Sequence, residues 1–186
     1  MIEFKECVHD HYMRSVVVYI LILAAIAAIS LPIIIFYVVL GGFLFGTLAG
    51  ALYSVIGATV GATLSFLVFR YILGDMVQKK YGESLGGFKQ KMKEHGISYI
   101  LILHYLTVVP FFIINTFAAL SPITLFQFIL TTIAGCLPLF LVYAFAGKGL
   151  GSIQSVGDIF SAPVIIACVL LSGLAFVPVI LKKFKQ

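Results

Sequence analysis

Three side chains, Arg70, His104 and Lys148, stand within or at the ends of long apolar runs and are the residues best placed for chemistry. Arg70 closes a run of Leu, Val and Phe, where its guanidinium can bind a phosphate through two parallel hydrogen bonds. The alternative is an anchor that reaches the polar surface of a bilayer. Lys148, at the end of a later apolar run, has the same two interpretations.

Within residues 96–147, His104 is the only side chain that gains or loses charge near neutral pH. His104 has two interpretations. In the first its ring contacts a ligand or relays a proton, and in the second it is a neutral histidine hydrogen-bonded to a backbone carbonyl. Asn115 follows Pro110 by about one helical turn. We expect its amide to satisfy backbone carbonyls freed at the proline rather than to bind a substrate.

No motif for catalysis or metal binding stands out. His9 and His11 flank Asp10, but residues two apart do not share a helix face, and no further ligand cluster accompanies them. HExxH, GxSxG and P-loop patterns are absent from the sequence. We therefore expect no enzyme activity, no catalytic residue, no metal and no cofactor.

The composition predicts a membrane protein. The chain of 186 residues is 62% hydrophobic and 10% charged, against roughly 25% charged residues in soluble domains. Residues 15–69, 96–147 and 159–181 contain no Asp, Glu, Lys or Arg. At about 20 apolar residues per crossing, these runs are too long for three simple spans. The basic residues gather in short islands between the runs, which argues against nucleic acid as a partner.

The chain resembles itself at an offset of 78 residues, and the matched residues keep their order. The matches are Pro32 with Pro110, Gly57 with Gly135, and Arg70 with Lys148. Residues 98–109 and 111–121 flank Pro110, and each stretch reaches about 17 Å as a helix, only half of a hydrocarbon core of about 30 Å. This length predicts a re-entrant hairpin with its tip at Pro110, where the freed carbonyls must be buried in protein or wet.

The predicted fold is all-α, with an inverted repeat of a re-entrant hairpin plus a transmembrane helix. In chain order we expect a tail (1–14), a hairpin with its tip at Pro32 (15–44), a span (47–73), a connector (75–95), a second hairpin (98–121), a span (124–146), and a C-terminal transmembrane helix with a basic tail (156–186). Residues 15–155 form the membrane domain. The alternative is that residues 15–31 cross the membrane as an ordinary span.

Charge and glycine spacing complete this architecture. The connector and the C-terminal tail carry eight Lys, which predicts that both are cytoplasmic. Glycines spaced every fourth residue let membrane helices approach closely, so we expect a helix-packing role for them. They are Gly42, Gly46, Gly50, Gly57 and Gly61, with Gly135 in the second span.

Residues 41–70, GGFLFGTLAGALYSVIGATVGATLSFLVFR, resemble the VTT domain of the DedA and SNARE-associated Golgi protein superfamily, and the resemblance extends over residues 15–155. The residues that match the family pattern are Pro32, Gly42, Gly46, Gly57, Gly61, Arg70, Pro110, Phe111, Asn115, Gly135 and Pro138. His104 replaces a usual arginine, Thr107 a proline and Ala119 a glycine. The acidic residues on which the bacterial proton-dependent branch relies are absent from residues 15–69, so a proton-coupled mechanism is in doubt.

The resemblance implies a protein of the plasma membrane, the inner membrane of a bacterium, that moves or scrambles phospholipid or carrier-lipid headgroups between leaflets. Membrane lipids are the implied partners, and the candidate headgroup contacts are Arg70, His104, Lys148 and Asn115. The alternative is a non-transporting membrane organiser that binds partner proteins. The sequence does not determine which lipid is moved or how its movement is coupled to energy. It also does not decide whether the protein forms a homo-oligomer.

The predicted topology can be tested by cysteine labelling. A cysteine placed near Gln90 should react only from the cytoplasm and one near Gln154 only from outside, because these positions lie on opposite sides of the predicted membrane domain. Labelling of both from one side would exclude the inverted repeat. A cysteine at residue 5 decides whether residues 15–31 cross.

Overall fold

The computed structural model describes residues 11–31, 33–74, 76, 79, 90, 97–105 and 110–151. Its helices are α2 (Tyr12–Ile29), α3 (Ile34–Phe45), α4 (Thr47–Tyr71), α6 (Ile97–Tyr105), α7 (Phe111–Ala119) and α8 (Leu125–Gly151). The predicted hairpin tip at Pro32, most of the predicted connector 75–95 and the predicted C-terminal helix in 156–186 lie outside the described residues.

Three helices are long and apolar enough to cross a membrane: α2, α4 and, within α8, Leu125–Leu150. α4 has 25 residues and α8 has 27, so at about 1.5 Å per residue both exceed a hydrocarbon core of about 30 Å. α6 and α7 have nine residues each and span less than half of that thickness. The described segments hold helices and no strand, so the all-α prediction is confirmed for them.

α2 bears on the alternative that the sequence left open. It has 18 residues, close to the lower limit of about 17 for a crossing helix. It ends at Ser30, which adopts the left-handed conformation with φ 58° and donates its backbone N–H to carbonyls of the last turn. By length α2 therefore suits a span or a long hairpin arm, and both interpretations stay predictions.

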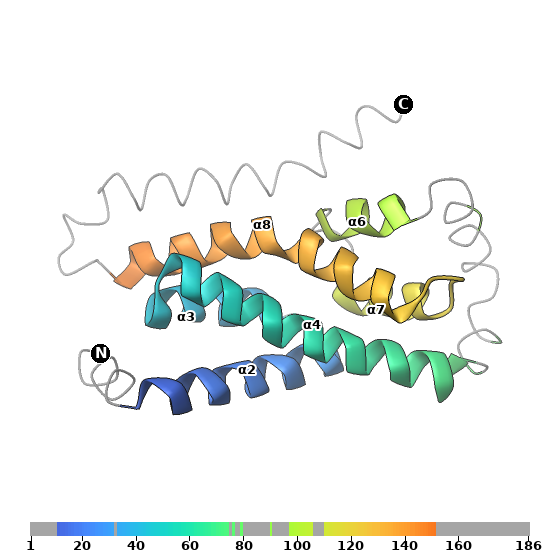
Figure 1. Cartoon of the computed structure of the whole chain (residues 1–186), viewed down its shortest axis with the longest axis horizontal. Coiled ribbons are helices and arrows are strands. Elements are labelled where there is room, and N and C mark those ends of the chain that lie inside the picture. The colour runs from blue at the N-terminus through green and yellow to red at the C-terminus, as the bar shows by residue number, and fades with distance from the viewer. Residues whose placement is uncertain are drawn as a thin grey trace.

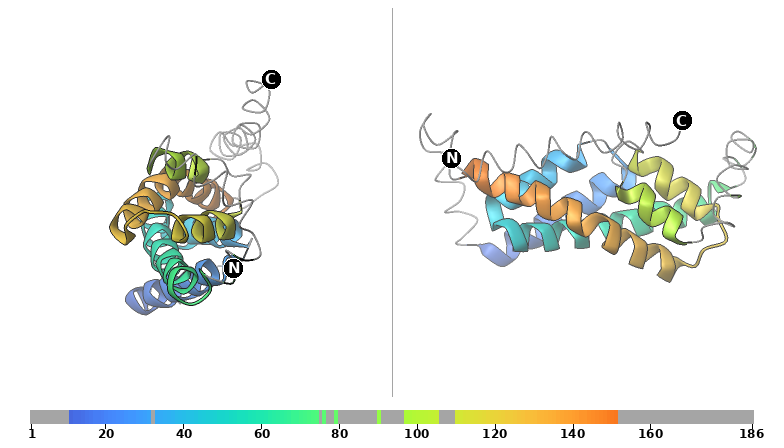
Figure 2. Two further views of the ribbon diagram at one scale, coloured as in Figure 1. Left: turned by 90° about the vertical axis from the view of Figure 1, so that its right-hand side faces the viewer. Right: turned by 90° about the horizontal axis from the view of Figure 1, so that it is seen from above.

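α4 and α8 pack against each other in the middle of the bundle, and the other helices flank them (Figure 1). α2 packs along α4, and α6 packs along α8, so the first helix of each pair lies on the long helix that follows it. α3 packs on α8 and also on α4, whereas α7 packs on α4. The left view of Figure 2 shows the same order of helices, from α2 through α4 and α8 to α6.

Two groups of buried side chains hold these helices together. The first joins α2, α3, α4 and α8, and in it the rings of Tyr19 and Tyr37 stack with their centroids 4.8 Å apart. The second joins α4, α6, α7 and α8, and in it Phe66 and Phe128 stack at 4.6 Å. The first group therefore holds α2 and α3 against α4 and α8, and the second group holds α6 and α7 against the same two helices.

Glycines on α4 bring the backbone of α2 close. A Cβ atom added at Gly57 would lie 3.1 Å from the Cβ of Leu23, and one at Gly61 would lie 2.6 Å from the Cβ of Ala27. Both distances are shorter than the 3.5–4.0 Å of an ordinary carbon contact. The two helices therefore pack along a surface that only glycine can supply.

The other close contacts involve α3, α6 and α8. A Cβ at Gly42 would collide with the backbone of Ala144 on α8, and one at Gly50 would lie 2.5 Å from a backbone oxygen of α3. A Cβ at Gly135 on α8 would lie 2.5 Å from the Cβ of His104 on α6. The sequence repeat pairs Gly57 with Gly135. Gly57 faces α2 and Gly135 faces α6, so each glycine faces the first helix of its own half.

The prediction that Gly46 belongs to the same helix-packing face is wrong. Gly46 ends α3 and precedes α4, with φ 82° and ψ 176°, and a Cβ there would meet nothing within 4 Å. Residues with a side chain rarely adopt this positive φ. Gly46 therefore serves the turn between two helices, and not a contact between them.

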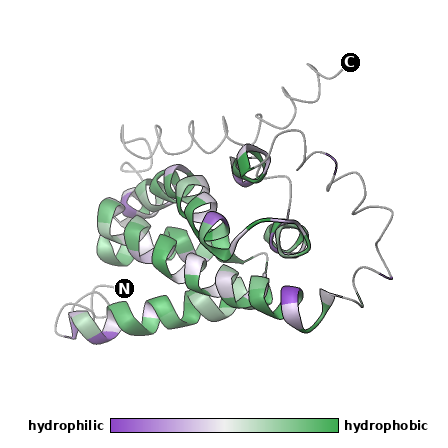
Figure 3. Ribbon diagram, turned by 45° about the vertical axis from the view of Figure 1, so that its right-hand side comes forward, coloured by the Kyte–Doolittle hydropathy of each residue, from purple (hydrophilic) through white to green (hydrophobic). Residues whose placement is uncertain are grey.

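The outward surface of the bundle is apolar, as a lipid environment requires. The ribbons are coloured hydrophobic over most of their length (Figure 3). Large apolar side chains such as Leu21, Leu64 and Phe126 are exposed on the three long helices. A surface this apolar would aggregate in water, so it fits a protein dissolved in a bilayer.

We expect Gly61→Val to destabilise the protein, because the new side chain would push α2 away from α4. Overpacking of this kind costs about 1–3 kcal/mol, which a lower melting temperature in detergent would report. Val60→Leu is the matched control, since Val60 is 46% exposed on the same helix. Equal melting temperatures for the two variants would contradict this packing.

Candidate functional site

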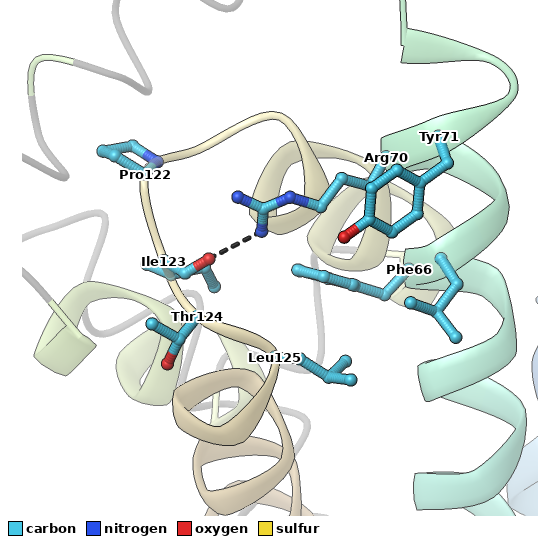
Figure 4. A pocket seen from close by; sticks show the side chains of 8 residues that line it. Phe66, Arg70, Tyr71, Pro122, Ile123, Thr124 and Leu125 are labelled. Atoms are coloured by element: carbon cyan, nitrogen blue, oxygen red, sulfur yellow. Dashed lines mark hydrogen bonds between the residues drawn. The ribbon is translucent and has the colours of Figure 1, made fainter.

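A pocket lies where the end of α4 meets the loop that leads into α8 (Figure 4). Its volume is about 370 Å³, and its lining residues are Phe66, Leu67, Arg70, Tyr71, Pro122, Ile123, Thr124 and Leu125. Arg70, half-buried, reaches across from α4 toward the loop. Its Nη1 donates a hydrogen bond to the backbone oxygen of Ile123 at 2.6 Å, and its guanidinium carbon lies 5.2 Å from the centre of the Phe66 ring.

The loop that faces Arg70 is held by its own hydrogen bonds. The hydroxyl of Ser121 donates to the carbonyl of Phe117 at 2.7 Å, and the N–H of Ile123 donates to the carbonyl of Ser121 at 2.8 Å. Thr124 and Gln127 then cap α8, because the side chain of each accepts the backbone N–H of the other. The carbonyl that Arg70 contacts is therefore fixed in position.

His104 lies buried on α6 against α8. Its Nδ1 lies 3.0 Å from the carbonyl oxygen of Ile100, and its ring meets that of Phe111 edge to face at 6.0 Å. This bond matches the interpretation of a neutral histidine paired with a backbone carbonyl. Its Nε2, however, is buried without a hydrogen-bond partner in the described part of the chain, so one ring nitrogen stays available.

Asn115 is buried within α7, and its amide finds no hydrogen-bond partner among the described residues. Pro110 immediately precedes α7, and Asn115 lies within that helix, fully buried. Its amide nitrogen and oxygen both lack a partner among the described residues, and so does the hydroxyl of the adjacent Thr116. Residues 106–109, whose carbonyls were expected to accept from this amide, lie outside the described residues, so that role stays a prediction.

Two further buried hydroxyls on α4, those of Thr59 and Ser65, also lack partners within the described residues. The buried hydroxyls of Tyr19 on α2 and Ser54 on α4 are bonded instead. The Tyr19 hydroxyl donates to the carbonyl of Tyr37 at 3.1 Å and lies 2.6 Å from the hydroxyl of Ser54. Unpartnered polar atoms thus gather on α4, α6 and α7.

Lys148 lies in a different environment from Arg70, the residue at the equivalent position of the sequence repeat. It is exposed near the end of α8, and Figure 1 places this end of the bundle opposite the end of α4 that carries Arg70. Among the described residues, no group of three or more His, Cys, Asp or Glu side chains gathers that could hold a metal ion.

Comparison with known proteins identifies the family. A family model described as the VTT domain matches residues 31–149, more than half of the chain. The chain belongs to the VTT domain family. The resemblance to the DedA and SNARE-associated Golgi protein superfamily is thereby confirmed, and with its three long apolar helices the chain is a multi-pass membrane protein.

One relative supports the same assignment. The "Transmembrane protein 41 homolog" of Dictyostelium discoideum is 28% identical over 177 residues, which cover 94% of this chain and 53% of that protein. The chain therefore spans about half the length of this relative. No solved structure matches the chain. The VTT domain match includes α3, α6 and α7 but begins after α2, later than the predicted start at residue 15.

Sequence reasoning about this VTT domain missed several residues of the pocket and of the polar group. Ile123 and Phe66 orient Arg70, yet one acts through its backbone and the other is an ordinary apolar residue. Thr59 and Thr116 could have been singled out in the sequence, because a hydroxyl in an apolar helix needs a hydrogen-bond partner. Which of these hydroxyls lacks a hydrogen-bond partner depends on the packing of the helices.

We expect Asn115→Leu to leave the melting temperature in detergent unchanged or to raise it. Removing an unpartnered buried amide relieves a penalty of about 1–3 kcal/mol. Ser54→Ala is the contrasting variant, because the Ser54 hydroxyl donates to the carbonyl of Gly50 and its loss should cost about 1 kcal/mol. An Asn115→Leu protein less stable than Ser54→Ala would show that the amide is bonded after all.

Proposed function

We propose that the chain moves or scrambles phospholipid or carrier-lipid headgroups between the two leaflets of its membrane, which we take to be a bacterial plasma membrane. A headgroup needs polar partners on its way past the hydrocarbon, while its acyl tails stay in lipid. The observation that carries this proposal is the set of buried, unpartnered polar groups on α4, α6 and α7.

These groups are expensive to keep without a ligand or water. Placing an amide or hydroxyl in apolar surroundings without a hydrogen bond costs roughly 2–7 kcal/mol. His104, Asn115 and Thr116 lie on the two short helices of the second pair, and Thr59 and Ser65 lie on α4. Water or the polar atoms of a passing headgroup would supply the missing bonds, so we place the path along this second pair.

The arrangement of the helices supports an inverted repeat. α4 begins at Thr47 and α8 at Leu125, positions separated by the same offset of 78 residues as Pro32 and Pro110. α2 packs on α4 and α6 packs on α8, each within its own half, whereas α3 packs on α8 as well as on α4, and α7 packs on α4. Inverted repeats with broken helices form the transport sites of many membrane transporters.

The pair α6 and α7 is the part that we propose to be re-entrant. Neither helix is long enough to cross a hydrocarbon core, and Pro110 stands immediately before α7. A hairpin that turns back within the membrane leaves a gap in the apolar barrier, which two opposed hairpins would extend across the bilayer.

Purified protein in liposomes with a fluorescent phospholipid tests this function. An outside quencher should reach inner-leaflet lipid and reduce the signal below the plateau of empty liposomes. We expect Asn115→Leu to slow this phase about tenfold, which corresponds to the loss of about 1.4 kcal/mol in the rate-limiting state. Ser54→Ala, on the bonded first half, should keep the wild-type rate.

A plateau equal to that of empty liposomes would overturn lipid movement. The organiser function would then be tested by capture of partner membrane proteins that survives Arg70→Ala and Pro110→Ala together. Translocation should instead suffer from either substitution, because one removes a charged contact and the other the break before α7.

A further inference from the structure

The pocket beside Arg70 is separate from the unpartnered groups that carry the proposed path. It lies at the end of α4, and its volume of about 370 Å³ is within the range of about 300–1,000 Å³ for small-molecule sites. Tyr71 at the wall of the pocket and the adjacent Ile72 are both exposed. Tyr is enriched at membrane interfaces, so the pocket is placed where lipid headgroups lie.

The guanidinium of Arg70 is held in one orientation and retains donors for a ligand. An arginine side chain carries five N–H donors, and among the described residues Arg70 donates one hydrogen bond, to the carbonyl of Ile123. The ring of Phe66 supports its face. A group fixed in this way loses little conformational entropy when it binds an anion, which strengthens binding.

The described structure offers Arg70 no counter-charge. None of the seven acidic residues of the chain lies among the described positions, so no carboxylate there neutralises the guanidinium. A guanidinium forms its strongest pairs with planar or tetrahedral oxyanions, to which it donates two parallel hydrogen bonds. In a membrane the phosphate of phospholipids is the oxyanion at this depth.

The first turn of α8 adds further donors at the edge of the pocket. Thr124 and Gln127 cap each other, which leaves the backbone N–H groups of Leu125 and Phe126 with no partner inside the helix. The start of a helix is also its positive end, where anions are stabilised. Leu125 itself lines the pocket.

We propose that this pocket binds a phosphate group, which Arg70 holds through two hydrogen bonds, and that a phospholipid of the cytoplasmic leaflet supplies it. The proposal rests on the proposed function and deepens it, because it names the chemical group by which a lipid is held before it moves. A soluble phosphate ester has the same chemistry and is the other source to be tested.

Binding can be measured on delipidated full-length protein in a neutral detergent, as the shift in melting temperature. The probes are a short-chain phosphatidic acid, the diacylglycerol with the same chains, and glycerol 3-phosphate. We expect phosphatidic acid to raise the melting temperature and diacylglycerol to leave it unchanged. Glycerol 3-phosphate should act only at much higher concentration, since it lacks the acyl tails.

Variants at Arg70 then locate the site. Arg70→Gln should weaken phosphatidic acid about 10- to 100-fold, the effect of losing charge-assisted hydrogen bonds. Arg70→Lys should retain part of the affinity, because it keeps the charge and loses the paired geometry. Arg14→Gln is the matched control, because Arg14 is an exposed arginine on α2 that does not line the pocket, and this variant should bind as the wild type does.

The outcomes separate this proposal from the proposed function. Equal shifts from diacylglycerol and phosphatidic acid, or wild-type affinity in Arg70→Gln, would overturn the phosphate site even if lipid translocation is observed. Equal potency of glycerol 3-phosphate would keep the phosphate site and reject the lipid as its source. Phosphate-dependent binding without translocation would overturn the proposed function alone.

A second variant covers the case in which Arg70→Gln fails to fold through loss of its bond to Ile123. Leu67→Trp places a larger ring at the wall of the pocket and leaves Arg70 unchanged. It should abolish the shift with phosphatidic acid while the unliganded melting temperature stays near that of the wild type. Unchanged affinity in this variant would exclude the pocket as the binding site.

Discussion

Close contact between helix backbones is the constraint on which this bundle depends. In lipid, helices gain little from hiding apolar side chains from one another, so they associate through van der Waals contact and short-range packing. Gly57 and Gly61 bring α2 onto α4, and Gly42 brings α3 onto α8. Because α4 and α8 each pack against helices from both halves, these contacts set which side chains of the described helices face one another.

The two halves of the VTT domain use similar helices in different ways. Around the first pair, hydroxyls such as Tyr19 and Ser54 are bonded within the protein. Around the second pair, Asn115 and one nitrogen of His104 are buried without a partner among the described residues. Unpartnered hydroxyls also occur on α4, at Thr59 and Ser65, so the polar atoms that water or a headgroup could bond belong to α4, α6 and α7.

The repeat also places two cations in equivalent positions and gives them different surroundings. Arg70 contacts Ile123 because the loop between α7 and α8 returns to the end of α4. Lys148 is exposed at the opposite end of the bundle. In the inverted repeat that we propose, the two membrane faces would be similar in backbone, so side chains and loops would supply any difference between the leaflets.

The sequence by itself determined the helical class, the VTT family and the positions of α4 and α8, because run length, glycine spacing and proline are local signals. Only the tertiary structure decided that Gly46 ends a helix, that the Asn115 amide has no partner among the described residues, and that Arg70 meets a backbone carbonyl 53 residues away. Hydrogen-bond partners distant in the chain are set by how helices pack, and the local pattern of residue types does not encode that geometry.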